Sequence, residues 1–309
     1  MKVQMKAGMK NRAQISRLPD GRRLHLHDGP IDLIVEAFGP ANEVVAAYRS
    51  AAERFVTVLD ELCAELPLLR QAARADGTRA AGVVAKRMQA AVAPYCERTF
   101  ITPMAAVAGA VAEEILSSMT SAARLSRAYV NNGGDIALYL APGEGFVVGM
   151  VERPDRPSLF GKVELHSADA VRGIATSGWR GRSFSLGIAD AVTVLADRAA
   201  AADAAATVIA NAVDLPGHPS VSRVPARSLA PDSDLGERLV TQAVGQLSCS
   251  EIAAALDAGF IVADALLSEG LIRAAALCLC GATRIVGVNV ISEQFITSQE
   301  KSSRSLLHA

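Results

Sequence analysis

Residues 127–140 have the sequence RAYVNNGGDIALYL, which predicts two strands joined by a tight turn. The turn lies at Asn131–Asp135, between two segments rich in strand-forming apolar residues. Its two adjacent glycines would let the main chain approach a ligand closely and present N–H groups to it. The turn therefore has two interpretations, an ordinary Asn-Gly-Asp hairpin turn or one wall of a ligand site.

Similar signals along the chain predict the other elements. A β-hairpin and a third strand are expected at 12–38, within an N-terminal β-hairpin region at 1–40. Further strands are expected at 146–152, 162–167, 171–178 and 190–196, and a closing hairpin is expected at 271–291 with its turn at Gly281–Thr283. Helices are expected at 41–69 (with an end or kink at Pro67), 78–93, 102–119, 199–213, near 237–247 and at 249–268. Ser248 and Glu251 form a capping box that opens the last helix, and Gly270 ends it.

The order of these elements predicts the fold class. Strands come mostly as antiparallel neighbours, with helices between groups of strands and a Pro/Ser-rich connection at 214–235. This order is typical of an α+β fold with mainly antiparallel sheets and packed helices, rather than of a doubly wound parallel sheet. We expect a single domain over 1–309 with a flexible polar tail at 293–309.

Composition excludes several classes of function. The 309 residues carry 31 Lys and Arg against 32 Asp and Glu, a net charge of −1, and only 4% are aromatic. A protein that grips nucleic acid needs a basic surface or aromatic stacking platforms, so no nucleic-acid partner is expected. Half of the residues are hydrophobic, which is enough for a large core.

The sequence predicts neither a membrane partner nor a secretory route. No segment reaches the roughly 18 uninterrupted apolar residues of a membrane span, and no apolar stretch follows the charged N-terminus, although Met1, Met5 and Met9 leave the start open. The five cysteines lack zinc-binding spacing, and Cys278 and Cys280 are expected on one face of a strand as reduced core residues. A cytoplasmic location is expected.

The helix at 102–119 has small residues throughout, with Gly109 at its middle. Such a helix must pack very closely against a neighbour. The close neighbour is either a sheet or a ligand at the start of the helix.

Two further clusters interrupt apolar segments with polar residues. The first runs from Ala175 to Ser183 and combines hydroxyls, glycines and arginines, namely Thr176, Ser177, Gly178, Arg180, Arg182 and Ser183. It is either a solvated loop or a site for a phosphate or carboxylate, since the planar arginine fork binds two oxygens at once. The second is Asp203 with Thr207, which share one helix face and offer oxygen ligands to a divalent cation. Alternatively, Asp203 lies in the first turn of the helix, where the helix dipole favours a negative charge, and Thr207 has only a packing role.

Histidines give weaker signals. His25 and His27 alternate along a strand and face the same side, but the sequence signals no third metal ligand, so a surface pair is the simpler interpretation. His166 is a candidate for acid–base chemistry or a structural histidine.

The order of the three clusters resembles the ApbE family of flavin transferases. The resemblance rests on the NGGD turn, the ATSG turn, and a VTV strand followed by ADAAAT, over about 100–213. It implies an ApbE-like, T-fold-like architecture that binds FAD and Mg²⁺ and transfers FMN to a threonine of a target protein. It also implies a flavin site and a metal site. The flavin site would contain Gly109, Asn132, Gly133, Gly134, Asp135, Thr176, Ser177 and Gly178, and the metal ligands would be Asp203 and Thr207.

The chain also departs from the transferases. Their His-x-x-Asp-Pro-x-Thr-Gly segment is replaced by WRGRSFSLGIAD at 179–190, which has no histidine, and the region from 214 onward is unlike theirs. The chain looks closer to a family of uncharacterised ApbE-like proteins of bacteria and archaea. That resemblance covers nearly the whole chain through MAAVAG (104–109), NGGD (132–135), SLGIAD (185–190) and ADAAATVIAN (202–211).

Three functions remain open. The preferred one is an ApbE-like enzyme, a hydrolase or transferase, that binds FAD or another flavin nucleotide with Mg²⁺. The second is a reassigned scaffold that converts a small anionic or heterocyclic metabolite, with Arg180 and Arg182 clamping the anion and Ser177 or Ser183 supplying a hydroxyl. In this chain only Trp179 and Tyr139 could stack on a flavin near the site. The third is a non-catalytic ligand-binding or assembly module; in each case a homo-oligomer is expected.

Overall fold

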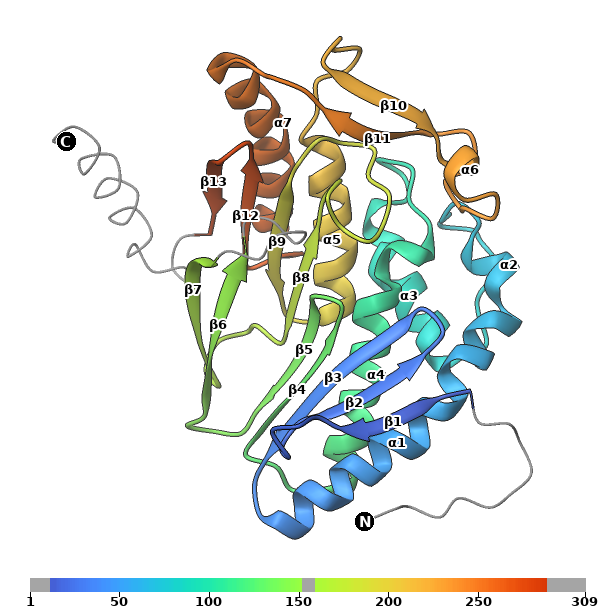
Figure 1. The fold of residues 1–309 in the computed structure, drawn as a ribbon, viewed down its shortest axis with the longest axis vertical. Coiled ribbons are helices and arrows are strands. Elements are labelled where there is room, and N and C mark those ends of the chain that lie inside the picture. Colours follow the sequence, from blue (N-terminus) through green and yellow to red (C-terminus); the bar gives the residue numbers. More distant parts are fainter. Residues whose placement is uncertain (1–11, 152–158, 288–309) are drawn as a thin grey trace, which may run out of the picture.

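The computed structural model describes residues 12–151 and 159–287. Among these residues, nine strands form one sheet in which every neighbouring pair is antiparallel (Figure 1). In spatial order the strands are β1 (Gln14–Arg17), β2 (Leu24–Asp28), β3 (Ile31–Phe38), β4 (Arg127–Asn132), β5 (Asp135–Leu140), β8 (Gly173–Ser177), β9 (Ala191–Ala196), β12 (Ala274–Leu279) and β13 (Ala282–Val286). The predicted α+β class is confirmed.

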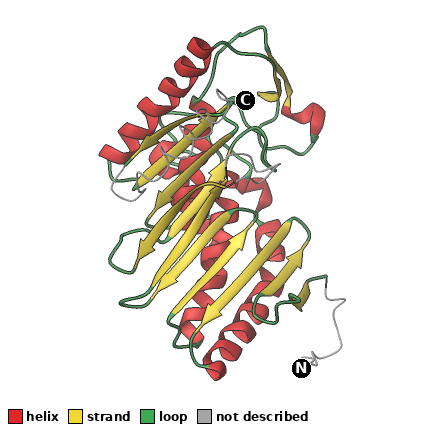
Figure 2. Ribbon diagram, turned by 60° about the vertical axis from the view of Figure 1, so that its left-hand side comes forward, coloured by secondary structure: helices red, strands yellow, loops and turns green. Residues whose placement is uncertain are grey.

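Helices cover one face of this sheet (Figure 2). The helices in the described residues are α1 (Ala41–Ala64), α2 (Leu66–Leu69), α3 (Val83–Val92), α4 (Val107–Ala122), α5 (Ala199–Ala212), α6 (Ala226–Leu229) and α7 (Cys249–Ser268), with 3₁₀ turns η1 (Ala93–Tyr95) and η2 (Pro103–Ala106). Helix α1 packs on β2 and β3, α4 on β4 and β5, α5 on β8 and β9, and α7 on β12 and β13. Helix α3 lies outside α4 and α5 and forms no layer of its own on the sheet. No helix among the described residues has the length and apolar character to cross a membrane.

Apolar periodicity explains the helix layer. The buried residues of α1 recur every three or four positions, as in Ala51, Phe55, Val58 and Leu62. Helix α1 ends at Ala64 and Pro67 lies in the first turn of α2, so the expected break at Pro67 is confirmed. Helix α4 is central, with α1, α3 and α5 around it and the sheet beneath, which is why its first two turns are rich in alanine and glycine.

A separate hairpin covers part of the other face. Strands β6 (Gly145–Val151) and β7 (Leu159–His166) pair only with each other. Their Leu165 joins Ile174, Leu195 and Ala276 of the main sheet in a second apolar core. The sheet is therefore buried on both faces at β8, β9 and β12.

The helix expected near 237–247 is wrong. Those residues contain strand β11 (Leu239–Val244), which pairs with β10 (Val221–Pro225) inside the segment interpreted as a connection. The segment is short and rich in β-branched residues, and Thr241 is fixed by hydrogen bonds: its N–H donates to the Ser185 carbonyl (2.9 Å) and its Oγ1 to the Gly187 carbonyl (2.8 Å). Pairing with β10 and the two hydrogen bonds of Thr241 to the 185–187 segment fix these residues as a strand.

The closing hairpin is confirmed, but its turn is displaced. Ala282 and Thr283 belong to β13, and Cys280 and Gly281 make the turn with positive φ angles of 49° and 82°. Cys278 is buried in β12 whereas Cys280 is exposed in the turn, so the two cysteines do not share a strand face. The expected tail at 293–309 and the end of the hairpin beyond 287 lie outside the described residues.

Candidate functional site

The start of α5 is held in very close contact with its neighbours. A Cβ atom on Gly109 of α4 would lie 2.3 Å from the Ala199 carbonyl oxygen, and one on Gly173 of β8 would lie 2.2 Å from the Ala199 nitrogen. Ala199 itself is fully buried. Only glycine allows these approaches, which set the position of the α5 residues that follow.

Asp203 lies one turn into α5 and faces the start of α4. Its Oδ2 accepts a hydrogen bond from the Gly109 N–H at 3.0 Å. Gly109 is in the first turn of α4, where backbone N–H groups have no partner within the helix. The carboxylate therefore sits at the positive end of α4, as the helix-dipole interpretation of Asp203 allows, although the helix concerned is α4 and not α5.

The Asn131–Asp135 turn is anchored to the same place. Gly133 and Gly134 have φ angles of 66° and 116°, and the Gly134 N–H donates to Asn131 Oδ1 at 2.8 Å. The Asn132 amide donates to the Ala108 carbonyl at 3.1 Å, which ties the β4–β5 hairpin to the first turn of α4. Asp135 Oδ1 accepts from the Thr176 N–H at 3.2 Å, and so the turn also contacts the end of β8.

Asp135 and Asp203 thus come together from distant parts of the sequence. Burial raises the pKa of Asp135 to about 7. Burial also raises the pKa of Asp203 well above its usual range, and the charge of Asp135 adds to that effect. Among residues 12–151 and 159–287, no basic side chain pairs with either carboxylate. Two carboxylates in one poorly solvated place, without a protein cation, have the chemistry of a divalent-cation site.

The donor set fits Mg²⁺. Each carboxylate uses one oxygen for a backbone N–H, and Thr207 lies one turn beyond Asp203 on the same face of α5, with no hydrogen-bond partner for its hydroxyl in the described residues. Hard divalent cations bind carboxylate and hydroxyl oxygens together. The sequence interpretation assigned Asp135 to a flavin site and only Asp203 and Thr207 to the metal, whereas the structure places Asp135 close to Asp203.

A different carboxylate organises the loop that follows β8. Asp190 is buried, and its Oδ1 accepts from Arg180 Nε at 2.5 Å and from Trp179 Nε1 at 3.2 Å. Its Oδ2 accepts from the Cys280 N–H at 2.7 Å, and a Cβ on Gly178 would lie 2.6 Å from its carbonyl oxygen. The sequence interpretation gave Asp190 no role, although it ends the SLGIAD segment.

The two arginines of this loop are in different environments. Arg180 is paired with Asp190 and stacks on the Trp179 ring, its Cζ 4.3 Å from the ring centroid. Arg182 is exposed and pairs with no described carboxylate, and its Nη1 lies 2.7 Å from where a Gly133 Cβ would be. It lines a pocket of about 290 Å³ together with His25, Asp32, Ile34, Asn131, Gly133 and Gly134.

The three hydroxyl side chains predicted near this loop, those of Thr176, Ser177 and Ser183, make few hydrogen bonds. Thr176 shares a hydrogen bond with Thr193 across β8 and β9 (Oγ1···Oγ1 2.9 Å), while Ser177 is half-buried at the end of β8. Ser183 is exposed, and within the described ranges neither serine hydroxyl has a hydrogen-bond partner. Hydrogen bonds and close contacts in the structure thus connect Gly109, Asn132, Asp135, Thr176 and Asp203, and none of those within the described residues includes the Ser183 side chain.

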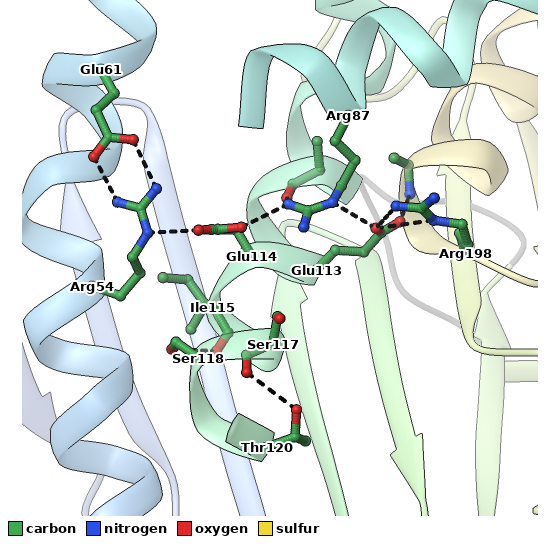
Figure 3. Close-up of polar contacts among 12 residues, drawn as sticks. Arg54, Glu61, Arg87, Glu113, Glu114, Ile115, Ser117, Ser118, Thr120 and Arg198 are labelled. Carbon is green, nitrogen blue, oxygen red and sulfur yellow. Dashed lines mark hydrogen bonds and ion pairs between the residues drawn. The ribbon is translucent and has the colours of Figure 1, made fainter. Parts of the chain in front are cut away.

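An ion-pair network holds α4 and α5 in register (Figure 3). Glu113 of α4 accepts from Arg87 Nε at 2.9 Å, from Arg198 Nη2 at 3.0 Å, and from the Ala200 N–H in the first turn of α5 at 2.8 Å. The neighbouring Glu114 binds Arg54 and Arg87, so the network links α1, α3, α4 and α5. Glu113 is thus the residue that connects the network to the helix carrying Asp203.

We expect Glu113→Ala to lower the free energy of unfolding by about 2 kcal/mol, because the partly buried Arg87 keeps only Glu114 as its ion-pair partner and the Ala200 N–H at the start of α5 loses its acceptor. Chemical denaturation measures the change. Glu61→Ala is the matched control: Glu61 is at the exposed end of the same network (39% exposed side chain), and its loss should cost about 1 kcal/mol or less. Equal losses in both variants would contradict the special role of Glu113.

Comparisons with known proteins agree with the sequence motifs. A family model described as "AbpE bacteria" matches residues 15–285. A UPF0280 protein of Methanopyrus kandleri is 37% identical over 178 residues, which cover 57% of this chain and 66% of the relative. A UPF0280 protein of Methanothrix thermoacetophila is 40% identical over 114 residues, which cover 37% and 46% of the two chains. The chain thus spans about half to two thirds of the length of these relatives.

A solved structure is also similar, that of a mutant flavin transferase ApbE from Vibrio cholerae. It has a TM-score of 0.46 and 11% sequence identity, and the match covers 92% of this chain and 98% of that one. The family model, by contrast, spans most of the chain in sequence. The ApbE-like resemblance of the motifs is thereby confirmed, and this chain belongs to the AbpE bacteria family.

Proposed function

We propose that this chain is an enzyme that binds a flavin nucleotide together with Mg²⁺ at the site formed by the Asn131–Asp135 turn, the end of β8 and the starts of α4 and α5. The observation that carries the proposal is the pair Asp135 and Asp203. The protein brings two carboxylates together, with raised pKa values and no basic side chain opposite them in the described residues. A divalent cation and a phosphate-bearing ligand would complete such a site.

Each residue has a role in this proposal. Asp135, Asp203 and the Thr207 hydroxyl hold the cation. Gly133 and Gly134, with positive φ angles, let the backbone of the turn approach the ligand. Gly109 holds α4 against the start of α5, and Thr176, Ser177 and Gly178 line the opposite wall. Mg²⁺, when bound, supplies charge neutralisation and Lewis acidity at a pyrophosphate.

Hydrolysis of FAD is favoured over transfer of FMN to a protein. The stretch 179–190 holds no histidine, and its one acidic residue, Asp190, is engaged by Trp179, Arg180 and the Cys280 N–H. A group in those contacts is not free to deprotonate an acceptor hydroxyl. An attacking water needs no acceptor protein, so the lack of a free base beside an acceptor hydroxyl does not prevent hydrolysis.

The test is a titration of the purified protein with FAD, with and without Mg²⁺, followed by flavin fluorescence. We expect saturable quenching that chelator abolishes, followed by release of FMN and AMP measured by chromatography. If chelator leaves FAD binding unchanged, the proposed role of Mg²⁺ is wrong. If the protein does not bind FAD, the proposed flavin ligand is wrong.

A second candidate function is conversion of a small anionic or heterocyclic metabolite. The observation in its favour is Arg182, an arginine without a carboxylate partner in the described chain that lines the 290 Å³ pocket beside the Gly133 turn. Arg180 is a poorer clamp than the sequence suggested, since Asp190 already occupies it. The third candidate is a non-catalytic module; if it serves assembly alone, no small ligand should raise the melting temperature.

For this metabolite function we expect Arg182→Ala to weaken the binding of a small anionic ligand found by thermal-shift screening by about tenfold or more, with little change in stability. Arg180→Ala should lower stability, because Asp190 would be left buried without its cation. Isothermal titration and thermal denaturation of both variants separate the two effects. Unchanged affinity in Arg182→Ala would exclude this arginine from the site.

A further inference from the structure

Strands β2 and β3 bring together three side chains of the kinds that bind metals, next to the pocket of about 290 Å³ described above. His25 and His27 alternate with the buried Leu24, Leu26 and Asp28 on β2, so they point to the face that the helices do not cover. Asp32 on β3 is the direct cross-strand neighbour of His27. The three residues, which we call the His-His-Asp cluster, are all partly buried, and their ligand atoms lie within 4.8 Å of one another.

The register of the hairpin supplies the ligand that the sequence did not reveal. His25 Nε2 already lies 2.6 Å from Asp32 Oδ1, and the two imidazole rings have centroids 6.2 Å apart. In a tetrahedral zinc site the ligand atoms are about 3.3 Å from one another, because each lies about 2.0–2.2 Å from the metal. Small side-chain rotations would bring the cluster to that geometry, with the metal replacing the proton shared by His25 and Asp32.

The chemistry of the cluster selects the kind of metal. Two imidazoles and one carboxylate are ligands typical of Zn²⁺ and other divalent transition metals, whereas Mg²⁺ prefers oxygen ligands alone. His25 and Asp32 also line the 290 Å³ pocket, whose other walls include Arg182, Gly133 and Gly134. Three protein ligands leave a coordination position open, as in catalytic zinc sites, and that position would face this pocket.

We propose that His25, His27 and Asp32 bind one divalent transition-metal ion of the Zn²⁺ class, at a site separate from Asp135 and Asp203. The proposal does not depend on flavin binding. A simple ion pair between His25 and Asp32 on adjacent strands is the competing explanation of the same contacts.

The experiment measures Zn²⁺ binding by the full chain, purified without a polyhistidine tag and stripped with chelator, in competition with a chromophoric zinc chelator. We expect one Zn²⁺ per chain. His27→Ala should weaken the binding by about 100-fold or more, since even residues that only support metal ligands cost 10–100-fold in affinity. Asp32→Asn, which keeps the shape of the side chain, should have a similar effect if His27→Ala folds poorly.

Two control variants separate this site from others. His218→Ala removes a histidine that pairs with Glu251 far along the chain, and Asp203→Asn disables the proposed magnesium site; both should retain Zn²⁺. Because the described chain has five free cysteines, Co²⁺ is used as a spectroscopic probe. A sulfur-to-cobalt charge-transfer band that persists in His27→Ala would overturn the proposal, as would the absence of Zn²⁺ binding by the parent protein.

Discussion

Asp203→Asn is expected to abolish the Mg²⁺ dependence of both stability and ligand binding, with a loss of Mg²⁺ affinity of about 100-fold or more. In the parent protein at pH 8, Mg²⁺ at 100 times its Kd should raise the free energy of unfolding by about 2.7 kcal/mol. The substitution keeps the side-chain shape and an oxygen for the Gly109 N–H, so the fold should persist. Thermal unfolding with and without Mg²⁺ measures the difference.

The pH dependence of the same measurement gives an independent check. The pKa values of Asp135 and Asp203 are both raised in the folded protein, whereas in the unfolded chain an aspartate ionises near pH 4. Between about pH 4 and 7 the native state therefore holds protons that the unfolded state releases, so stability without metal should fall as pH rises. Mg²⁺ binds the ionised pair, and its stabilising effect should be small at pH 5 and large at pH 8.

The control for this prediction is Asp257→Asn, which removes an exposed carboxylate paired with Arg284. It should leave the Mg²⁺ effect and the pH slope unchanged. A Mg²⁺ effect of full size in Asp203→Asn would mean that the cation binds elsewhere, and the proposed site would have to be abandoned.

Gly109→Ala is expected to destabilise the protein by about 3 kcal/mol, an unusual result for this substitution inside a helix. Alanine normally stabilises a helix relative to glycine by roughly 1 kcal/mol. In this helix the new methyl group would lie 2.3 Å from the Ala199 carbonyl oxygen and 2.7 Å from the Ala200 nitrogen, both of which are backbone atoms. Because these backbone atoms cannot move away from the methyl group by a side-chain rotation, α4 and α5 must separate.

The separation should also affect the site. Moving α5 away from α4 lengthens the hydrogen bond between the Gly109 N–H and Asp203 and draws Asp203 away from Asp135. Chemical denaturation gives the stability change, and a Mg²⁺ titration of the folded variant gives the effect on the site. Gly181→Ala is the control, because it is an exposed loop position where a Cβ meets only one carbonyl oxygen at 3.1 Å. A Gly109→Ala protein as stable as the parent would contradict the close packing described above.

Local sequence patterns predicted most of the elements because each pattern reports on the burial of one segment. The alternation at 24–28, the three-and-four spacing of α1 and the Ser248–Glu251 capping box all appear as expected. The small residues of 102–119 also correctly indicated a close approach, and Gly109 is the point of contact. These features depend on neighbours within a few positions, which the sequence displays directly.

Features that depend on distant partners were missed. Strand β11 was predicted to be a helix because its partner β10 looked like a connection, and β-propensity depends on the strand against which a segment packs. Arg180 was expected to bind a ligand, but the fold places Asp190 against it. The sequence also gave no reason to join Asp135 to Asp203, because they lie far apart in the chain and are held by different backbone groups, the Thr176 N–H and the Gly109 N–H.

The sequence by itself therefore determined the α+β class, the family and the glycine-rich turn, because periodicity, motif order and backbone freedom are local properties of the chain. Only the tertiary structure decided which polar groups meet: Asp135 with Asp203, Arg182 with the Gly133 turn, and Asp32 with the two histidines. Strand register and helix packing set those encounters, and both arise from many weak contacts between segments far apart in sequence.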